Sequence, residues 1–380
     1  MEFELNEQQR MVRDMARDFA AGEIEPNAAA WDRDKTFPKE VLAKAAKLGF
    51  MGMTIPEAYG GIGLDMLSYV LVLEEIARSC ASTCVIISVQ NSLFANGIVK
   101  FGSEEQRQRF LPRTAAGEIL GAYLLTEPGA GSDAGSLRCK AEKAEGGWRL
   151  TGSKAFITNG GHADHGITYA VTKPEAGTKG ISAFVLDLNA KGVERGPEEK
   201  KLGLHASSTV MVTLDGAFVP EADLLGIENR GFNIAMEILN TGRIGIAAQA
   251  LGIAGAALDE ALRYASQRQQ FDSPIDRFQS VQWHLVKMAT ELDAARLLAY
   301  RAAVNYDAGR NIVKEAAMAK LFASRTAAEA AERAVQIHGG YGYTKDYKVE
   351  RLFRDAKITE LYEGTSEIQR IVIARQIMVG

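Results

Sequence analysis

The spacing of apolar residues changes twice along the chain, and this constrains the fold more than any other feature. Up to about residue 120 apolar residues recur at helical spacing, whereas residues 121–230 hold short alternating runs broken by Gly and Pro. Long helical patterns return from residue 231. The order predicts an α+β protein with an N-terminal helical domain (1–120), a middle β domain (121–230) and a C-terminal antiparallel four-helix bundle (231–380).

Four helices are expected in the first segment, at Asn6–Ala21, Pro38–Leu48, Asp65–Ser79 and Thr83–Phe101. Asn6 is followed three residues later by Gln9, and Ser103 by Gln106, so both pairs predict capping boxes. Gly22 predicts the end of the first helix, because glycine tolerates the left-handed conformation that often follows a helix.

Short strands are expected in the middle segment, at Ala122–Leu125, Trp148–Thr151, Lys154–Ile157, Ile167–Val171, Ile181–Leu188 and Thr209–Leu214. Together they predict a small barrel or sandwich. In the last segment, helical runs at about 232–266, 280–307 and 312–337 and a final helix from Thr365 predict the bundle.

Composition limits the classes of function. A net charge of −4 implies no basic face, so nucleic acid is not expected as a partner. Three cysteines indicate a reducing compartment without a disulfide framework, and Cys80 and Cys84 are expected to be buried. No apolar run suggests a membrane span, and the acidic N-terminus predicts no signal peptide. No GxGxxG follows an early strand, which argues against a Rossmann domain.

The strongest chemical motif runs from Ile358 to Arg370, ITELYEGTSEIQR. Glu363 lies beside Gly364, so its carboxylate stands on backbone that can bend and approach a ligand. Thr365 or Ser366 is a natural N-cap of the helix that follows. The alternative is that Glu363 merely ends a loop before a capped helix, where acids are common.

A second motif, LLTEPGAGSDAGS, packs Thr126, Gly131 and Ser132 into one loop after a strand. Its glycines would allow backbone N–H groups to approach a polar, phosphate-bearing or ring-bearing ligand. An elaborate surface loop is the alternative. Nearby, Phe156 and Thr158 share one side of a strand, which suits the face and edge of a planar cofactor or simply a core aromatic.

Two further motifs lie in the last segment. Arg268 follows a helix and could anchor a phosphate or be a solvated surface residue. QIHGGYGY places His338 before Gly339 and Gly340, which is either a helix C-cap or a tight loop against a ligand.

Two clusters resemble sites but are interpreted otherwise. His162 and His165 have metal-like spacing without a third ligand in view, so no metal site is expected. Arg351, Arg354 and Lys357 form the basic edge of a helix and are expected to be solvated or paired.

As an ordered set, LLTEPGAGSDAG, FITNG, QIHGGYGY and YEGTSEIQR resemble the acyl-CoA dehydrogenase flavoproteins over essentially the whole chain. SVQNSL, GRIGIAAQALGIA and KEAAMAKL are similar to short-chain (butyryl-type) or short branched-chain members. The resemblance implies FAD as cofactor, a short-chain acyl-CoA as substrate, and a role in fatty-acid β-oxidation or branched-chain amino-acid catabolism. It also implies electron-transfer flavoprotein as electron acceptor, a homotetramer, and a cytoplasmic (bacterial) or processed mitochondrial-matrix location.

The resemblance assigns site residues by matching motifs. Glu363 matches the catalytic base, and Gly242 stands where some members carry the base instead. The flavin contacts matched are Tyr123, Leu125, Thr126, Gly131, Ser132, Phe156, Thr158, Arg268, Gln279, Gln336, His338, Gly339, Gly340, Thr365, Ser366 and Glu367. Those from Arg268 to Gly340 typically act across a subunit boundary. The acyl-CoA contacts matched are Ser132, Asn240, Arg243 and Gly364.

Three positions depart from the family pattern. Asn240 stands where short-chain members usually have Asp, although branched short-chain members can carry Asn; His205 replaces a usual Arg and Asp272 a usual Gly. The implied reaction removes an α-proton by Glu363 and a β-hydride to flavin N5, giving a trans-2-enoyl-CoA. A related flavin oxidase that reduces oxygen and a non-catalytic flavin-binding protein are the alternatives.

Overall fold

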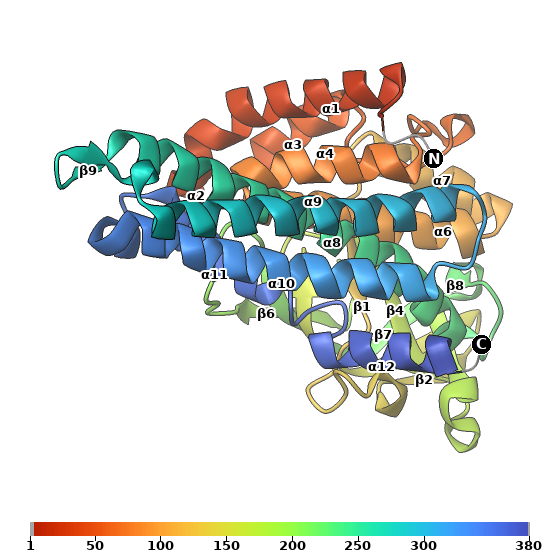
Figure 1. Cartoon of the computed structure of the whole chain (residues 1–380). Helices are drawn as coiled ribbons and strands as arrows, with labels where there is room; N and C mark the ends of the chain where they lie inside the picture. Colours follow the sequence, from red (N-terminus) through yellow and green to blue (C-terminus); the bar gives the residue numbers. More distant parts are fainter. Residues whose placement is uncertain (1–3, 379–380) are drawn as a thin grey trace.

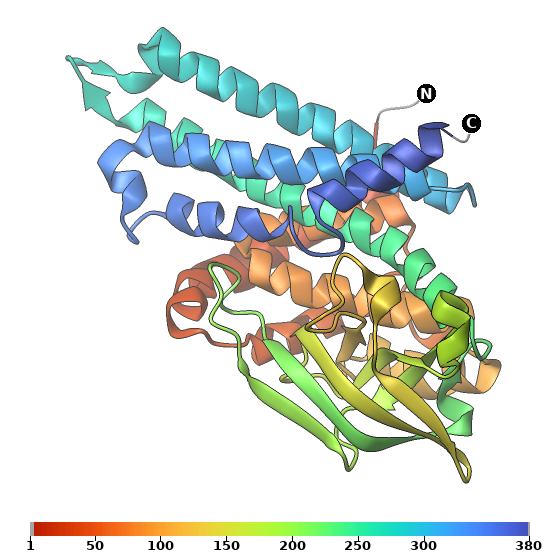
Figure 2. The ribbon, with the colours of Figure 1, turned by 90° about the horizontal axis from the view of Figure 1, so that it is seen from below.

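The computed structural model describes residues 4–378 and contains two helical regions with a sheet between them in sequence (Figure 1). The first region consists of α1 (Glu7–Phe19), α2 (Glu25–Asp34), α3 (Lys39–Lys47), α4 (Met66–Ser79), α5 (Ala81–Ser88), α6 (Asn96–Phe101) and α7 (Glu104–Ala115). Figure 2 shows the sheet as one layer and the long C-terminal helices as another. This is the predicted α+β architecture, and we keep the boundaries near residues 120 and 230 as a proposal.

Both predicted capping boxes are present at helix starts. The Asn6 side chain accepts from Gln9 N at 2.8 Å, and Ser103 Oγ accepts from Gln106 N at 3.2 Å. The predicted stop at Gly22 is wrong, because a π-helical turn over Ala20–Ile24 carries the chain directly into α2. The helical stretch ends instead at Asp34, where Lys35 adopts the left-handed conformation with φ 54°.

Within residues 4–378, two helical stretches are long and apolar enough to cross a membrane, contrary to the sequence-based expectation: Ala81–Phe101, which includes a π-helical turn, and Gly231–Gln267. In each, 83% of the apolar window is buried inside the protein. A helix that is apolar all round and buried is a core helix.

The sheet contains eight strands: β1 (Gly121–Leu124), β2 (Lys140–Ala144), β3 (Gly147–Thr158), β4 (His165–Val171), β5 (Ile181–Asp187), β6 (Val193–Glu198), β7 (Thr209–Pro220) and β8 (Leu224–Leu225). The order is β6-β7-β3-β2-β4-β5-β8, and β1 pairs with β4 in parallel off this path. The strands predicted at Trp148–Thr151 and Lys154–Ile157 form one strand, because irregularities in β3 shift its register against β7 without interrupting it. Buried residues of the middle region, including Trp148, Phe184 and Val212, form a separate hydrophobic core.

The C-terminal region contains α8 (Gly231–Gln267), α9 (Gln279–Asp307), α10 (Val313–His338), α11 (Lys348–Ile358) and α12 (Ser366–Met378). The short helix α11 is an addition to the four predicted. Figure 1 shows α9 and α10 side by side, with the hairpin of β9 (Gln269–Gln270) and β10 (Ser273–Pro274) extending from one end.

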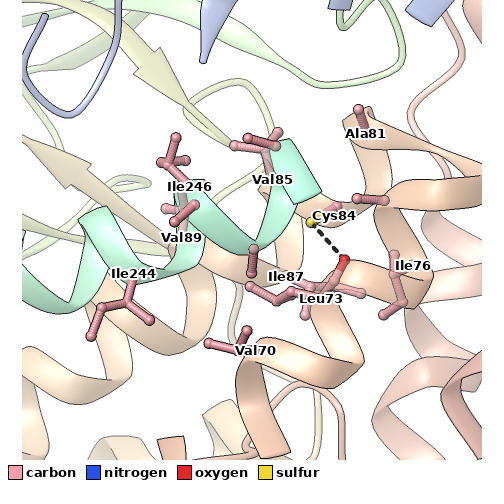
Figure 3. Packing of buried hydrophobic residues seen from close by; sticks show 14 of the residues in the cluster. Val70, Leu73, Ile76, Ala81, Cys84, Val85, Ile87, Val89, Ile244 and Ile246 are labelled. Carbon is pink, nitrogen blue, oxygen red and sulfur yellow. Dashed lines mark hydrogen bonds between the residues drawn. The ribbon is translucent and has the colours of Figure 1, made fainter. Parts of the chain in front are cut away.

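Helix α8 packs against helices of both the first and the last region. Figure 3 shows Ile244 and Ile246 of α8 packed among Val70, Leu73, Cys84 and other residues of α4 and α5. A side chain at Gly252 would meet Glu74 O of α4 at 2.4 Å, so glycine allows this close approach. Cys84, predicted to be buried, donates to Leu73 O at 3.4 Å.

Candidate active site

The turn between α11 and α12 carries Glu363 in a strained conformation. Glu363 has φ 52° and Gly364 has φ 92°. A left-handed residue other than glycine costs roughly 1–2 kcal/mol, so surrounding contacts must hold this turn. Thr365 Oγ1 accepts from Ile368 N at 3.4 Å, which makes Thr365 the N-cap that the sequence offered as one of two choices.

Two side chains fasten the turn from neighbouring helices. Lys320 Nζ of α10 donates to Gly364 O at 2.8 Å. Gln369 Nε2 of α12 donates to the same oxygen at 2.8 Å and to Glu363 O at 3.2 Å. Neither contact could be predicted from the sequence, because both residues lie in ordinary helical patterns.

The Glu363 carboxyl group lies in a desolvated site. Within residues 4–378 its buried Oε2 has no hydrogen-bond partner. Burial raises the pKa of Glu363 to about 7, and the positive charges of Lys320 and Arg243 oppose this rise. A carboxylate with these properties is suited to accepting a proton near neutral pH.

Helix α8 faces this carboxylate with Gly242 and Arg243. A Cβ atom at Gly242 would lie 2.1 Å from Glu363 Oε2, so only glycine leaves room for the carboxylate there. Arg243 is buried and donates to Asn240 Oδ1 at 2.7 Å, and burial lowers the pKa of its guanidinium group. The structure therefore brings the predicted base together with Arg243 and Asn240, two residues matched to acyl-CoA contacts.

The predicted flavin-cradling loop follows β1. Tyr123 OH donates to Ala235 O of α8 at 3.2 Å, and Thr126 O accepts from Ala155 N at 2.9 Å. Cβ atoms at Gly129 and Gly131 would meet nothing within 4 Å, so the chain itself leaves this side of the loop open.

A buried ion pair beneath this loop was not predicted. Lys154 Nζ donates to Glu127 Oε1 at 2.8 Å and to Leu125 O at 3.3 Å. Glu127 also accepts from Arg138 N at 2.6 Å and Cys139 N at 3.0 Å. Only the tertiary fold brings these groups together, so the pattern of residues held no signal for them.

Phe156 and Thr158 lie on one side of β3, as predicted from their spacing. Phe156 has φ 56° and stays 67% exposed, while Thr158 is half-buried and Ile157 between them is buried. The bulge between Lys154 and Ile157 thus turns a large aromatic face outward. The Phe156 ring is exposed and held in a strained conformation, which does not fit the alternative that it is a core aromatic.

A recess of about 500 Å³ lies at the end of the bundle where α8 and α10 end. Its lining includes Arg268, His338, Gly339 and Gly340, four residues matched to flavin contacts. The His338 ring stacks on Tyr264 with 4.1 Å between centroids. Among the described residues its buried Nε2 lacks a hydrogen-bond partner.

The remaining matched residues lie outside that recess. Gln279 opens α9 and Gln336 is in the last turn of α10, and both side chains are exposed. Ser132 is an exposed residue of the loop after β1, and Ser366 and Glu367 begin α12. The matched flavin contacts therefore form separate groups in one chain, and a site across a subunit boundary stays a prediction.

The clusters set aside earlier have structural partners. His162 packs on the Phe37 ring at 4.0 Å, and His165 meets the Phe110 ring edge-on at 5.2 Å. Arg354 pairs with Asp32 at 2.7 Å and with Glu350 at 2.7 Å, in line with the expectation of a paired basic edge.

Two of the departures from the family pattern also have clear positions. His205 Nδ1 lies 3.3 Å from Asp32 Oδ1. Asp272 and Phe271 both have positive φ, 60° and 51°, in the two-residue turn between β9 and β10. Two-residue turns of this kind favour glycine at the second position, so the Asp is locally strained.

Comparison with protein families decides the identity of this fold. The models described as acyl-CoA dehydrogenase N-terminal, middle and C-terminal domains match residues 6–118, 122–217 and 229–378 in turn. The chain belongs to the acyl-CoA dehydrogenase family.

Curated acyl-CoA dehydrogenases resemble the chain over its full length. An acyl-CoA dehydrogenase of Bacillus subtilis is 53% identical, covering 99% of both chains. A short-chain specific acyl-CoA dehydrogenase of Clostridium acetobutylicum is 47% identical, covering 99% of this chain and 100% of its own length.

Solved structures agree with this assignment. Butyryl-CoA dehydrogenase from Megasphaera elsdenii superposes with a TM-score of 0.98 at 42% identity, covering 100% of both chains. A structure reported for the electron transferring flavoprotein of Acidaminococcus fermentans superposes with a TM-score of 0.99 at 44% identity, covering 100% of both chains.

Acyl-CoA dehydrogenases are FAD-dependent oxidoreductases of fatty-acid β-oxidation, and the residues present fit that cofactor. The open glycine loop after β1 and the outward ring of Phe156 suit a flat ring system. The recess beside Arg268, with the unpartnered Nε2 of His338, suits a polar nucleotide portion. Because these groups are chemically matched to FAD, they are the residues that we expect to hold it.

Proposed function

We propose that this acyl-CoA dehydrogenase converts short-chain acyl-CoA thioesters to trans-2-enoyl-CoA, with Glu363 as the base. The observation that supports this most directly is the buried, unpartnered Oε2 of Glu363 opposite Gly242. Other carboxylates near the site, Glu360 and Glu367, do not share that position, since Glu367 is exposed and both lie on other turns of the segment.

Glu363 removes the α-proton of the thioester. Burial that raises its pKa to about 7 makes it a stronger base than an ordinary glutamate, while the nearby cations keep part of it ionised at neutral pH. The strained turn holds the carboxylate in a fixed orientation, so little entropy is lost in positioning it during the reaction. An apolar acyl chain would keep water away from the carboxylate and preserve that basicity.

FAD, when bound, supplies the acceptor for the β-hydride. We propose that the loop residues Tyr123 to Ser132, Phe156 and Thr158 hold it from one subunit. Arg268, Gln279, Gln336 and residues 338–340 would complete the site from a neighbouring subunit, which makes a homotetramer part of the proposal.

Asn240, Arg243, Ser132 and Gly364 are proposed to contact the acyl-CoA. Arg243 is already oriented by its hydrogen bond to Asn240, so both side chains would present fixed polar groups to the thioester arm. The short-chain preference is supported by the relatives described as short-chain specific and as butyryl-CoA dehydrogenase.

The electron acceptor is proposed to be an electron-transfer flavoprotein in the bacterial cytoplasm or its mitochondrial equivalent. The similarity to a structure reported for such a flavoprotein supports this choice. Oxygen is the competing acceptor, and hydrogen peroxide produced at the rate of substrate turnover under air would favour an oxidase.

The test is a rate series with straight-chain acyl-CoA substrates from C4 to C16 and an artificial electron acceptor, with isobutyryl-CoA included because of Asn240. We expect the highest kcat/KM at C4 to C6 or with isobutyryl-CoA, and a trans-2-enoyl-CoA product. An optimum at C12 or longer would contradict the proposed substrate class.

A further inference from the structure

Lys320 is a buried cation whose hydrogen bond goes to a carbonyl group. It lies in the first third of α10 with 0% of its surface exposed, and its Nζ donates to Gly364 O at 2.8 Å. Taking an ammonium group out of water is costly, and an aliphatic side chain could fill the same space without that cost. The charge therefore calls for an explanation beyond packing.

Gln369 provides an internal comparison, because it donates to the same carbonyl oxygen at the same distance of 2.8 Å. Both residues hold the strained Glu363-Gly364 turn, one from α10 and one from α12. They differ in charge, since only Lys320 places a positive charge beside the turn. The hydrogen bond alone could be supplied by an uncharged donor.

Several other charged and titratable groups face this turn. Arg243 approaches from α8, Glu360 from the end of α11 and Glu367 from the start of α12. Tyr69 of α4, Tyr123 of β1 and Tyr362 of the turn itself face the Glu363 carboxylate. Of these groups, Lys320 and Arg243 are the cations.

We propose that Lys320 is a positioning residue for this reaction: its ammonium group fixes the Glu363-Gly364 turn and keeps the Glu363 carboxylate ionised at neutral pH. The inference rests on the proposed function, because it takes Glu363 as the base. It gives helix α10 a role in proton abstraction in addition to its packing in the bundle.

The charge balance agrees with this geometry. Burial raises the pKa of Glu363 to about 7, and Lys320 is the largest influence that lowers it. Burial lowers the pKa of Lys320 itself to about 8, with Glu363 opposing, so the lysine remains mostly protonated at pH 7. Removing the positive charge would raise the pKa of Glu363 further and leave less of the base ionised.

The test compares Lys320→Met with Gln369→Met in the FAD-loaded enzyme. Each substitution removes one hydrogen bond to Gly364 O, but only the first removes a charge. For Lys320→Met we expect the acid limb of the kcat/KM profile for butyryl-CoA to move up by about one pH unit or more. Gln369→Met is expected to lower the rate without moving that limb, and Lys320→Arg to restore the wild-type limb.

An independent readout is the infrared band of the protonated Glu363 carboxyl group, identified by its loss in Glu363→Gln. Lys320→Met should extend this band to higher pH by the same amount as the acid limb. An acid limb and a carboxyl band unchanged in Lys320→Met, or moved equally in Gln369→Met, would overturn the inference. If Lys320→Met does not fold, Lys320→Gln makes the same test while retaining a hydrogen-bond donor.

The failure of this inference differs from the failure of the proposed function. If Glu363→Gln retains wild-type turnover, Glu363 is not the base and both fall. If Glu363→Gln is inactive while Lys320→Met keeps the wild-type acid limb, only the role of Lys320 is wrong.

Discussion

Glu127 is buried and Glu363 is half-buried with a buried Oε2 atom; each lies near a buried lysine, yet their surroundings are opposite. Glu127 pairs directly with Lys154 at 2.8 Å and accepts two backbone hydrogen bonds. Glu363 has no partner for its Oε2 among residues 4–378, because the nearby Lys320 donates to the Gly364 carbonyl instead. The first arrangement stabilises a loop, and the second leaves a carboxylate available for chemistry.

The difference shows how position selects a role for one residue type. A fully paired carboxylate has no free lone pair directed at a substrate and is costly to disturb. An unpartnered carboxylate costs stability in the folded state, as functional sites commonly do, and gains basicity. Substitutions in the two regions should therefore affect different quantities.

The largest effect is expected from Glu363→Gln. Turnover should fall by at least about 10²–10⁴-fold, because no other carboxylate in the described part of the chain occupies this position. FAD content should stay at the wild-type level, as measured by flavin absorbance, and the circular dichroism spectrum should show the same fold. A variant that keeps half of the wild-type rate would remove the distinction between the two glutamates.

Glu127→Gln should act on stability instead. Leaving Lys154 buried without its partner is expected to lower the free energy of unfolding by about 3–5 kcal/mol in urea titrations. Adding Lys154→Met should recover part of this loss, because the unpaired charge is then gone. A cost below about 1 kcal/mol would mean that the pair behaves like an exposed salt bridge.

The pH dependence of stability distinguishes Glu363 further. Its pKa is raised from 4.5 to about 7, so the folded protein holds a proton that the unfolded chain has released between these values. The resulting stabilisation, about 3 kcal/mol, is present below pH 4.5 and lost as the pH rises through 7. Urea titrations from pH 4 to 8 should show this loss in the wild type relative to Glu363→Gln, and parallel curves would contradict the shift.

Gly242→Ala should disturb the unpartnered carboxylate directly. The new methyl group would lie 2.1 Å from Glu363 Oε2, so the carboxylate must move. Displacement of about 1 Å at a reacting group can cost about 10²-fold, and kcat/KM should fall by up to that amount. The control is Gly22→Ala, whose added methyl group meets nothing within 4 Å and should leave kcat/KM unchanged.

The smallest effect concerns strain outside the active site. Asp272→Gly removes a left-handed non-glycine residue from the β9–β10 turn and should raise the free energy of unfolding by at most about 1 kcal/mol. Gly364→Ala, at φ 92° in the catalytic turn, should instead reduce both stability and turnover. A loss of stability in Asp272→Gly would show that the Asp side chain makes a needed contact.

Local sequence patterns predicted much of this architecture. Capping pairs such as Asn6 with Gln9, and the change of periodicity near residues 121 and 231, predicted the regions and the starts of helices. The helix end predicted at Gly22 was wrong, because a π-helical turn stands there in place of a C-cap. The motif around Glu363 identified the catalytic candidate because its order with other motifs is specific.

Contacts between distant segments could not be predicted from the same patterns. Lys320 and Gly364 are 44 positions apart, and Lys154 and Glu127 are 27 apart. A lysine at a helical or strand position looks like an ordinary surface residue until the fold buries it. The electrostatic setting of both glutamates therefore emerges only at the level of tertiary structure.

The most direct measurement is an anaerobic absorbance titration of the yellow, FAD-loaded protein with butyryl-CoA, beside Glu363→Gln. We expect the flavin band of the wild type to bleach within the mixing time of a manual experiment, while the variant binds substrate and stays yellow. Equal bleaching of both proteins, or no bleaching of the wild type with butyryl-CoA or isobutyryl-CoA, would contradict it.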